Sequence, residues 1–167
     1  RRMHGTAPQK ARAARTSQIA RMVAPLGESL VEHRDRALIL LGFAGALRRS
    51  ELVGLNIEDV VEDEYGLRLT LKVSKTDQER AGALVGVPYG SHVPTCPVRS
   101  WRAWLTATHI SEGPAFRPVN RHGHLLRNRL SGRSVAEVVK RRAQDVGLDG
   151  QWSGHSLRSG FATEGYA

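Results

Sequence analysis

One helix that loses its polar face near its end places the strongest constraint on the fold. Ser29 is a favourable N-cap, and the helix that it opens becomes almost continuously apolar between Leu38 and Phe43. A helix that is apolar on all sides is buried in the core of its domain. Gly42 and Gly45 allow neighbouring elements to pack closely against it. The sequence therefore predicts a core helix, followed by Arg48.

Shorter helical patterns lie on both sides of this core helix. The helix before it ends at Pro25 and Gly27. The most clearly amphipathic helix is the one that begins at Ser134, and Gly147 is a suitable C-terminal cap for it. Trp101 and Trp104 have helical spacing and are expected in the core rather than as platforms for stacked bases. The further helices are predicted to begin at Thr16, Ser50, Pro97, Ser134 and His155.

The middle of the chain changes to the period of a strand. Apolar and polar residues alternate from Leu67 to Val73, which predicts a half-buried strand. Residues 59–61 are a plausible partner strand, with a turn at residues 62–66, and residues 83–87 suggest a third strand. The expected fold class is α+β: mainly α-helical, with a small three-stranded antiparallel sheet at the edge.

Charge and cysteine content narrow the possible functions. The chain has 167 residues, which suits one domain, and its 25 Lys and Arg against 16 Asp and Glu give a net charge of +9. Such a balance favours a nucleic-acid partner, although an arginine-rich composition is also typical of a high-GC genome. A lone cysteine, Cys96, excludes an internal disulfide framework and a cysteine-cluster zinc site. No apolar run is long enough to cross a bilayer, and a cytoplasmic setting is expected.

Four residues form a set that suits chemistry at a phosphodiester. Arg48 follows the core helix, Lys75 lies in a polar hairpin tip, and His155 and Arg158 are one helical turn apart. Two arginines aimed at the non-bridging oxygens would stabilise the charge of a pentacoordinate phosphorane. A lysine can protonate the leaving alkoxide and a histidine can shuttle a proton. This chemistry requires no metal. The pair His122 and His124 suggests a metal site only weakly, because no other ligand is paired with them.

Three motifs in this order resemble those of the tyrosine recombinases, also called phage-type integrases. They are ALRRSEL at residues 46–52, SKTDQ at residues 74–78 and HSLR at residues 155–158. The resemblance extends from about Thr16 to the end of the chain. It implies a tyrosine-recombinase-type catalytic domain over residues 16–167, incomplete at its C-terminal end. Residues 1–15 resemble the linker that precedes this domain, or a basic arm.

The resemblance also implies a role for each residue of the site. Arg48 and Arg158 would clamp the scissile phosphate, and Lys75 would be the general acid for the 5′-hydroxyl leaving group. His155 would assist proton transfer to and from the nucleophile, and Glu51 would support the site without reacting. DNA would be cut and rejoined through a 3′-phosphotyrosyl intermediate, so neither a cofactor, ATP nor a metal is expected. Lys72 is a weaker competitor for the lysine role.

Partners follow from the same resemblance. The substrate would be double-stranded DNA, held in part by Arg133, Lys140 and Arg141 on and near the amphipathic helix. The complete protein would assemble as a tetramer on DNA, associated with the nucleoid, with no membrane partner and no small-molecule substrate. Whether the reaction is integration, excision or resolution stays open.

The nucleophile is where the sequence departs from the family pattern. Tyr166 lies too close to Arg158 to match the family's nucleophilic tyrosine, and Tyr65 and Tyr89 lie in the sheet region. The chain as given is therefore expected to be inactive alone. The alternatives are a non-catalytic DNA-binding integrase remnant and a relaxing enzyme of the type IB topoisomerase kind. An RNA-binding protein is disfavoured because no aromatic-rich strand motif is present.

Overall fold

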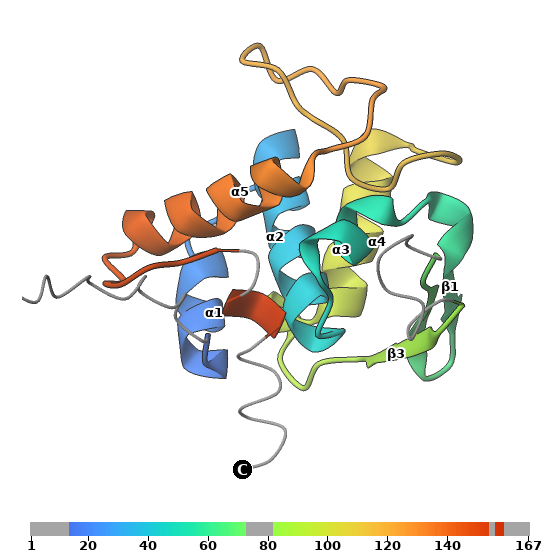
Figure 1. Cartoon of the computed structure of the whole chain (residues 1–167), viewed down its shortest axis with the longest axis horizontal. Helices are drawn as coiled ribbons and strands as arrows, with labels where there is room; N and C mark the ends of the chain where they lie inside the picture. The colour runs from blue at the N-terminus through green and yellow to red at the C-terminus, as the bar shows by residue number, and fades with distance from the viewer. Residues whose placement is uncertain (1–13, 73–81, 154–155, 159–167) are drawn as a thin grey trace, which may run out of the picture.

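The structure is a computed structural model that describes residues 14–72, 82–153 and 156–158 (Figure 1). Its helices lie around α2, and its small sheet lies at the edge, as the fold class predicted. The elements are, in chain order, α1 (Thr16–Val23), α2 (Leu30–Ala44), α3 (Arg49–Gly54), η1 (Ile57–Asp59), β1 (Val60–Asp63), β2 (Gly66–Thr70), β3 (Leu84–Pro88), η3 (Val93–Thr95), α4 (Pro97–Thr108) and α5 (Gly132–Asp145).

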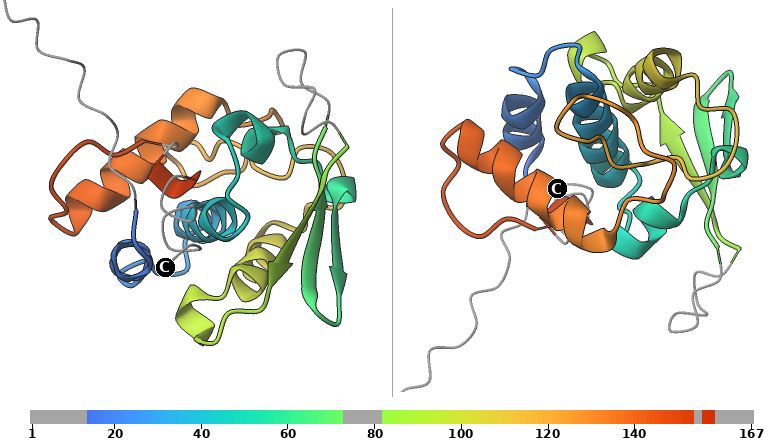
Figure 2. Two further views of the ribbon diagram at one scale, coloured as in Figure 1. Left: turned by 60° about the horizontal axis from the view of Figure 1, so that its bottom comes forward. Right: turned by 90° about the horizontal axis from the view of Figure 1, so that it is seen from above.

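Helix α2 is the core helix that the sequence predicts. Ser29 caps its start, since its Oγ accepts a hydrogen bond from the backbone N–H of Glu32 at 3.2 Å. Leu38, Ile39 and Leu41 are fully buried, and α2 packs against α1, α3, α4 and α5. From Leu38 to Leu41 the apolar run is therefore buried on every side, because the other helices surround it (Figure 2), and Phe43 at its end is partly buried.

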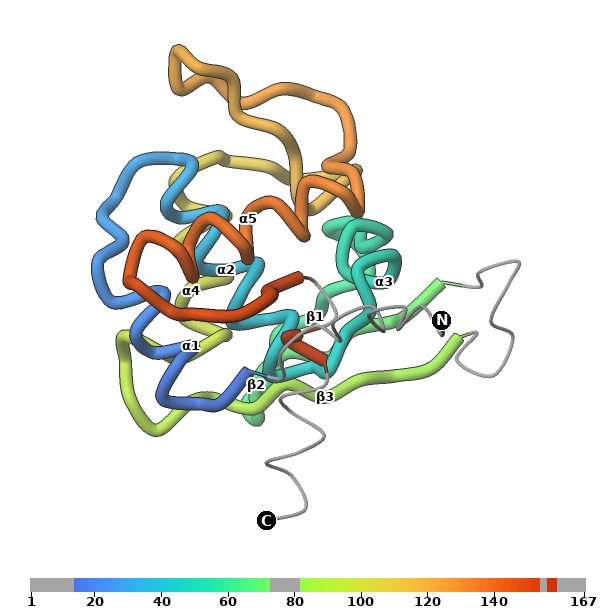
Figure 3. Tube along the Cα trace, turned by 60° about the vertical axis from the view of Figure 1, so that its left-hand side comes forward, coloured from blue at the N-terminus to red at the C-terminus, as the bar shows by residue number. Residues whose placement is uncertain are grey.

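Helix α4 contributes the aromatic part of the core. Trp104 is completely buried, and its Nε1 donates to the carbonyl oxygen of Ala115 at 2.8 Å. The Trp101 ring meets Phe116 edge to face, with centroids 6.0 Å apart. Both tryptophans are thus core residues, as predicted. They fix the start of the long loop between α4 and α5, which rises from the body of the molecule (Figure 3).

Helix α5 begins earlier than predicted. Its N-cap is Ser131, whose Oγ accepts from the N–H of Ser134 at 3.1 Å, so Ser134 is already inside the helix. Both residues are serines, and the periodicity of the apolar stripe alone did not distinguish them. The end of the helix agrees with the prediction, since Gly147 adopts a φ of 70° just after it.

The sheet has the order β1-β2-β3 with antiparallel neighbours. Pairing of β1 with β2 continues to Asp63 and Gly66, so the predicted turn at residues 62–66 is too long. Asp63 allows this tighter turn, because its Oδ1 accepts from the N–H groups of Tyr65 and Gly66 at 2.9 and 3.2 Å. At the other end of β2, Leu71 still pairs with Ala83.

Gly66 cannot be replaced without strain. Its φ is 142°, and a Cβ there would lie 2.2 Å from the carbonyl oxygen of Val87. We expect Gly66→Ala to lower the free energy of unfolding by about 1–3 kcal/mol. Gly86→Ala on the neighbouring strand is the matched control and should change it little, since no atom lies within 4 Å of its added Cβ. Urea denaturation of both variants measures the difference, and equal stabilities would contradict this account of the turn.

A buried charge network joins α2 to α5. Arg142 follows the exposed Lys140 and Arg141 in the chain, yet its Nε and Nη2 contact Oδ2 of the fully buried Asp35, both at 2.9 Å. The other oxygen, Oδ1, pairs with Arg34 at 3.0 Å. A buried carboxylate needs such partners, so Arg142 points inward although its position in the helix is peripheral.

The polar edge of the sheet is tied to α4 by a second, more exposed contact. Arg102 pairs with Glu62 of β1 and donates to the Tyr89 hydroxyl at 2.6 Å. The hydrogen bond from Arg102 lowers the pKa of the Glu62 carboxyl.

In the part of the chain that the structure describes, no helix has the length and apolar character required to span a membrane.

Candidate active site

Arg48 is positioned by the way in which α2 ends. The N–H of Leu47 donates to the carbonyl oxygen of Gly42 at 3.0 Å, and that of Ala46 to Phe43 at 3.2 Å. This pair of bonds is a Schellman motif, with Ala46 in the left-handed conformation at a φ of 50°. Leu47 is buried by the turn, so Arg48 emerges at a fixed point between two helices.

Glu51 holds the other side of Arg48. Arg48 is the N-cap of α3, and its backbone N–H donates to Glu51 Oε1 at 2.8 Å. A carboxylate in the first turn also suits the positive end of a helix. The contact fixes the backbone of Arg48. The supporting role of Glu51 in the site stays a prediction.

The structure brings Arg48 and Arg158 to one pocket. The pocket has a volume of about 290 Å³ and is lined by Arg48, Arg49, Ser50, Ser153 and Arg158. Residues 156–158 are helical and lie beside the start of α3 (Figure 2). Leu157, the one apolar residue of the HSLR motif, is buried. Three arginines thus line the same small polar pocket: Arg48 and Arg49 come from the junction of α2 and α3, and Arg158 comes from much later in the chain.

Packing explains why the two segments meet. Gly42 of α2 lets the segment approach, because a Cβ at that position would lie 3.0 Å from the Leu157 side chain. The hydroxyl of Ser156 is buried and accepts from the N–H of Ser153 at 3.0 Å. The core helix predicted from the sequence therefore carries both the turn to Arg48 and the surface on which Leu157 rests.

Two residues of the expected site, Lys75 and His155, lie outside the described residues. The pairing of Leu71 with Gly82 and Ala83 brings the two ends of the segment that contains Lys75 side by side. The competing residue, Lys72, is described, and its Nζ lies 3.6 Å from Oδ2 of Asp59, the last residue of η1. Tyr166 is likewise outside the described residues.

The predicted DNA contacts on α5 are exposed. Arg133, Lys140 and Arg141 share a face of the helix at positions i, i+7 and i+8. Arg133 pairs with Glu137 at 3.2 Å, yet its side chain is 89% exposed. The helix starts beside the pocket, since a Cβ on Gly132 would lie 3.7 Å from the Cβ of Arg49.

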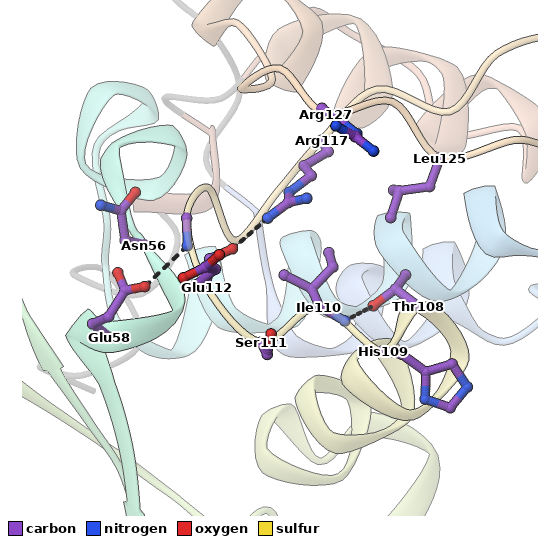
Figure 4. Close-up of a pocket in the computed structure, with 11 residues that line it drawn as sticks. Asn56, Glu58, Thr108, His109, Ile110, Ser111, Glu112, Arg117, Leu125 and Arg127 are labelled. Atoms are coloured by element: carbon purple, nitrogen blue, oxygen red, sulfur yellow. Dashed lines mark hydrogen bonds between the residues drawn. The ribbon is translucent and has the colours of Figure 1, made fainter.

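A second polar hollow carries none of the predicted site residues (Figure 4). It measures about 680 Å³, and Arg117, Glu112 and Glu58 lie around it, where Glu58 accepts from the N–H of Gly113 at 2.9 Å. Among residues 14–72, 82–153 and 156–158, no group of three or more metal-ligating side chains gathers here or elsewhere. His122 and His124, which suggest a metal site only weakly, therefore have no third metal-ligating side chain grouped with them among these residues.

We call the pocket lined by Arg48, Arg49, Ser50, Ser153 and Arg158 the arginine pocket. Sequence reasoning missed two of its residues, Ser50 and Ser153. Ser50 was noted only as the start of a helix, and Ser153 lies in the turn that follows α5. Neither has a pattern of its own in the sequence, and only the approach of Ser153 and residues 156–158 to α3 brings them together. Their hydroxyl groups can donate to a phosphate oxygen.

Comparison of the sequence with known proteins identifies a family and several relatives. The model of the phage integrase family matches residues 14–166. An integrase/recombinase XerD homologue of Selenomonas ruminantium is 44% identical over 137 residues, which is 81% of this chain and 40% of that protein. The tyrosine recombinase XerD of Corynebacterium glutamicum is 35% identical over 136 residues, 80% of this chain and 40% of its own. The chain thus spans about two fifths of these relatives.

Solved structures show the same fold. The XerA recombinase superposes with a TM-score of 0.71 and 17% identity, over 98% of this chain and 53% of that one. The XerH site-specific recombinase bound to its difH substrate gives a TM-score of 0.67 and 18% identity, over 95% of this chain and 43% of that one. At this level of identity the similarity concerns the arrangement of the elements only.

Proposed function

Because the chain belongs to the phage integrase family, the tyrosine recombinases, we propose that it supplies the phosphate-binding part of a site-specific DNA strand transferase. The observation that carries this proposal is the pocket shared by Arg48 and Arg158. Guanidinium groups bind the oxygens of a phosphodiester in pairs and are never deprotonated at physiological pH. Of the three arginines that line this pocket, the family resemblance assigns the phosphate to Arg48 and Arg158.

The two arginines would act mainly in the transition state. Attack on phosphorus forms a new bond to the nucleophile's oxygen, breaks the bond to the 5′ oxygen and concentrates negative charge on the non-bridging oxygens. Guanidinium groups fixed in advance stabilise that charge more than the charge of the ground state. The Schellman turn and the bond from Arg48 N–H to Glu51 fix the first arginine. The packing of Leu157 against α2 fixes the second.

Proton transfer and attack are assigned by the family resemblance. We assign to Lys75 the protonation of the departing 5′ oxygen, and to His155 proton transfer to and from the nucleophile. The nucleophile would be a tyrosine hydroxyl, which becomes joined to the 3′ phosphate. Neither described tyrosine, Tyr65 or Tyr89, lines the arginine pocket. The bond energy is kept in the phosphotyrosyl link, so rejoining reverses the same steps.

Double-stranded DNA is the proposed substrate, and α5 is the element proposed to lie along it. Its exposed Arg133, Lys140 and Arg141 can each neutralise a backbone phosphate. Arg142 is not part of this surface, because Asp35 holds it inside. Recombination joins two duplexes, so we further propose that the complete protein works as a tetramer.

A salt titration tests the DNA-binding part of this proposal. We expect Lys140→Ala/Arg141→Ala to weaken binding to duplex DNA and to reduce the slope of log affinity against log salt concentration by about 2. Fluorescence anisotropy at several salt concentrations measures both quantities. Gln144→Ala, an exposed change further along α5, is the control and should leave the slope unchanged. An affinity of the wild-type protein that does not vary with salt would contradict the proposal.

A further inference from the structure

Arg129 lies near the end of the loop between α4 and α5, in a stretch of purely positive charge. Residues 113–136 contain no Asp or Glu, and their arginines are Arg117, Arg121, Arg127, Arg129 and Arg133. In a DNA-binding protein, a run of this kind is expected to contact phosphates with every arginine. In the structure Arg129 instead donates to protein oxygens, as Arg117 does to the carbonyl oxygens of Pro114 and Glu112, and its partners belong to α3 and the residue that follows it.

The side chain of Arg129 is directed at the C-terminal end of α3. Its Nη1 donates to the carbonyl oxygens of Val53 and Leu55, at 2.7 and 3.2 Å, and its Nη2 donates to Asn56 Oδ1 at 2.6 Å. The last carbonyl groups of a helix have no partner within the helix, and a cation there is favourable. The guanidinium group is thus engaged by three protein oxygens.

The backbone on both sides of this contact is fixed. Leu130 is buried, and its N–H donates to the carbonyl oxygen of Phe116 at 2.9 Å. Ser131 then caps α5. The carbonyl oxygen of Leu55 also accepts from the N–H of Ala115 at 2.9 Å. Arg129 therefore joins the end of α3 to the entry of α5 at a point where neither can shift alone.

Helix α3 depends on such contacts for its orientation. It has six residues, so it is about 9 Å long and has little stability of its own. Arg48 caps its first turn, and Arg49 and Ser50 of that turn line the arginine pocket. A tilt at the Arg129 end moves the pocket end of the same rigid unit.

We propose that Arg129 is a positioning residue for the arginine pocket: it clamps α3 so that Arg48 faces the scissile phosphate, and it does not itself bind DNA. The inference rests on the proposed strand-transfer function. A misplacement of about 1 Å at a reacting centre lowers a rate by about 100-fold. Loss of the clamp should therefore slow the chemical step while leaving the DNA-binding surface intact.

The test uses Arg129→Ala in the full-length product of the gene, with Arg127→Ala as the matched control. Arg127 lies two residues away in the same loop and lines the polar hollow of Figure 4 instead. Duplex DNA with a nick beside the cleavage position traps the covalent adduct, so the single-turnover rate at saturating DNA can be measured. For Arg129→Ala we expect a rate about 10- to 100-fold lower, with affinity and salt slope within about twofold of wild type.

Two results would overturn the clamp. One is a salt slope lowered by about 1, which identifies a phosphate contact. The other is an adduct rate equal to that of the wild-type protein. If Arg129→Ala does not fold, Arg129→Lys decides the question, because it keeps the charge but cannot bridge three oxygens. A phosphate contact predicts a nearly normal Arg129→Lys protein, whereas the clamp predicts the lower rate with a normal slope.

Failure of the proposed function gives a different result. If the wild-type protein forms no adduct at any DNA concentration, strand transfer itself is refuted. Hydrogen exchange without DNA then decides the clamp. Faster exchange of the α3 amides in Arg129→Ala or Arg129→Lys, with Arg127→Ala unchanged, supports it, and unchanged exchange in both Arg129 variants overturns it.

Discussion

Replacing Arg48 or Arg158 by alanine is expected to slow formation of the covalent protein–DNA adduct by about 1,000-fold or more. Arginines that meet the charge of a phosphoryl transition state contribute factors of this size. Affinity for duplex DNA should fall much less, because many other phosphates are bound elsewhere. Adduct formation on nicked DNA and anisotropy on intact DNA measure the two quantities with the same full-length variants.

The control for this prediction lies in the same pocket. Arg49 also lines it but is an exposed residue of α3, and the family resemblance assigns it no role. We expect Arg49→Ala to alter the adduct rate by only about a few-fold. An Arg48→Ala or Arg158→Ala variant with a nearly normal adduct rate would show that the phosphate is held elsewhere. A protein that binds DNA but never forms an adduct would favour the non-catalytic remnant.

Asp35→Asn is expected to have the largest effect on stability. Asp35 is completely buried, and its two oxygens pair with Arg34 and Arg142. Removing the negative charge leaves two guanidinium groups without it, one nearly buried and one with its side chain 14% exposed. Breaking a buried pair in this way costs about 3–5 kcal/mol in the free energy of unfolding. Urea denaturation at neutral pH measures the loss.

Asp145 supplies the matched control for this stability effect. It pairs with the same Arg142 at 3.5 Å, but its side chain is 52% exposed. Exposed pairs contribute little, so we expect Asp145→Asn to change the free energy of unfolding by less than about 1 kcal/mol. A small effect for Asp35→Asn, similar to that of Asp145→Asn, would mean that the buried network does not hold α5 on α2.

The elements that the sequence predicted well are those with a strong local signal. The apolar run of α2, the tryptophan pair of α4 and the alternation in β2 each specify burial directly. The start of α5 was misplaced at Ser134, because the apolar stripe does not distinguish this serine from the true N-cap, Ser131. The turn between β1 and β2 was misjudged because its length depends on the Asp63 side chain rather than on hydrophobic pattern.

The arrangement of the site required the fold. The motif order suggested Arg48 and Arg158, but Ser153 joins them only because Ser153 and Arg158 lie beside α3 and Leu157 packs on α2. The direction of each arginine was also hidden. Arg142 is on the basic helix yet pairs with Asp35, and Arg129 is in the basic loop yet donates hydrogen bonds to the end of α3. A sequence shows that such charges exist, whereas their partners lie far along the chain.

The central claim, that Arg48 and Arg158 neutralise charge on one scissile phosphate, is tested most directly by removing that charge from the DNA. A methylphosphonate at the cleavage position replaces one charged non-bridging oxygen by a methyl group. We predict that Arg48→Ala and Arg158→Ala lose most of their defect in adduct formation on this substrate, relative to the wild-type protein. A defect of unchanged size on the neutral and the charged substrate would contradict the account.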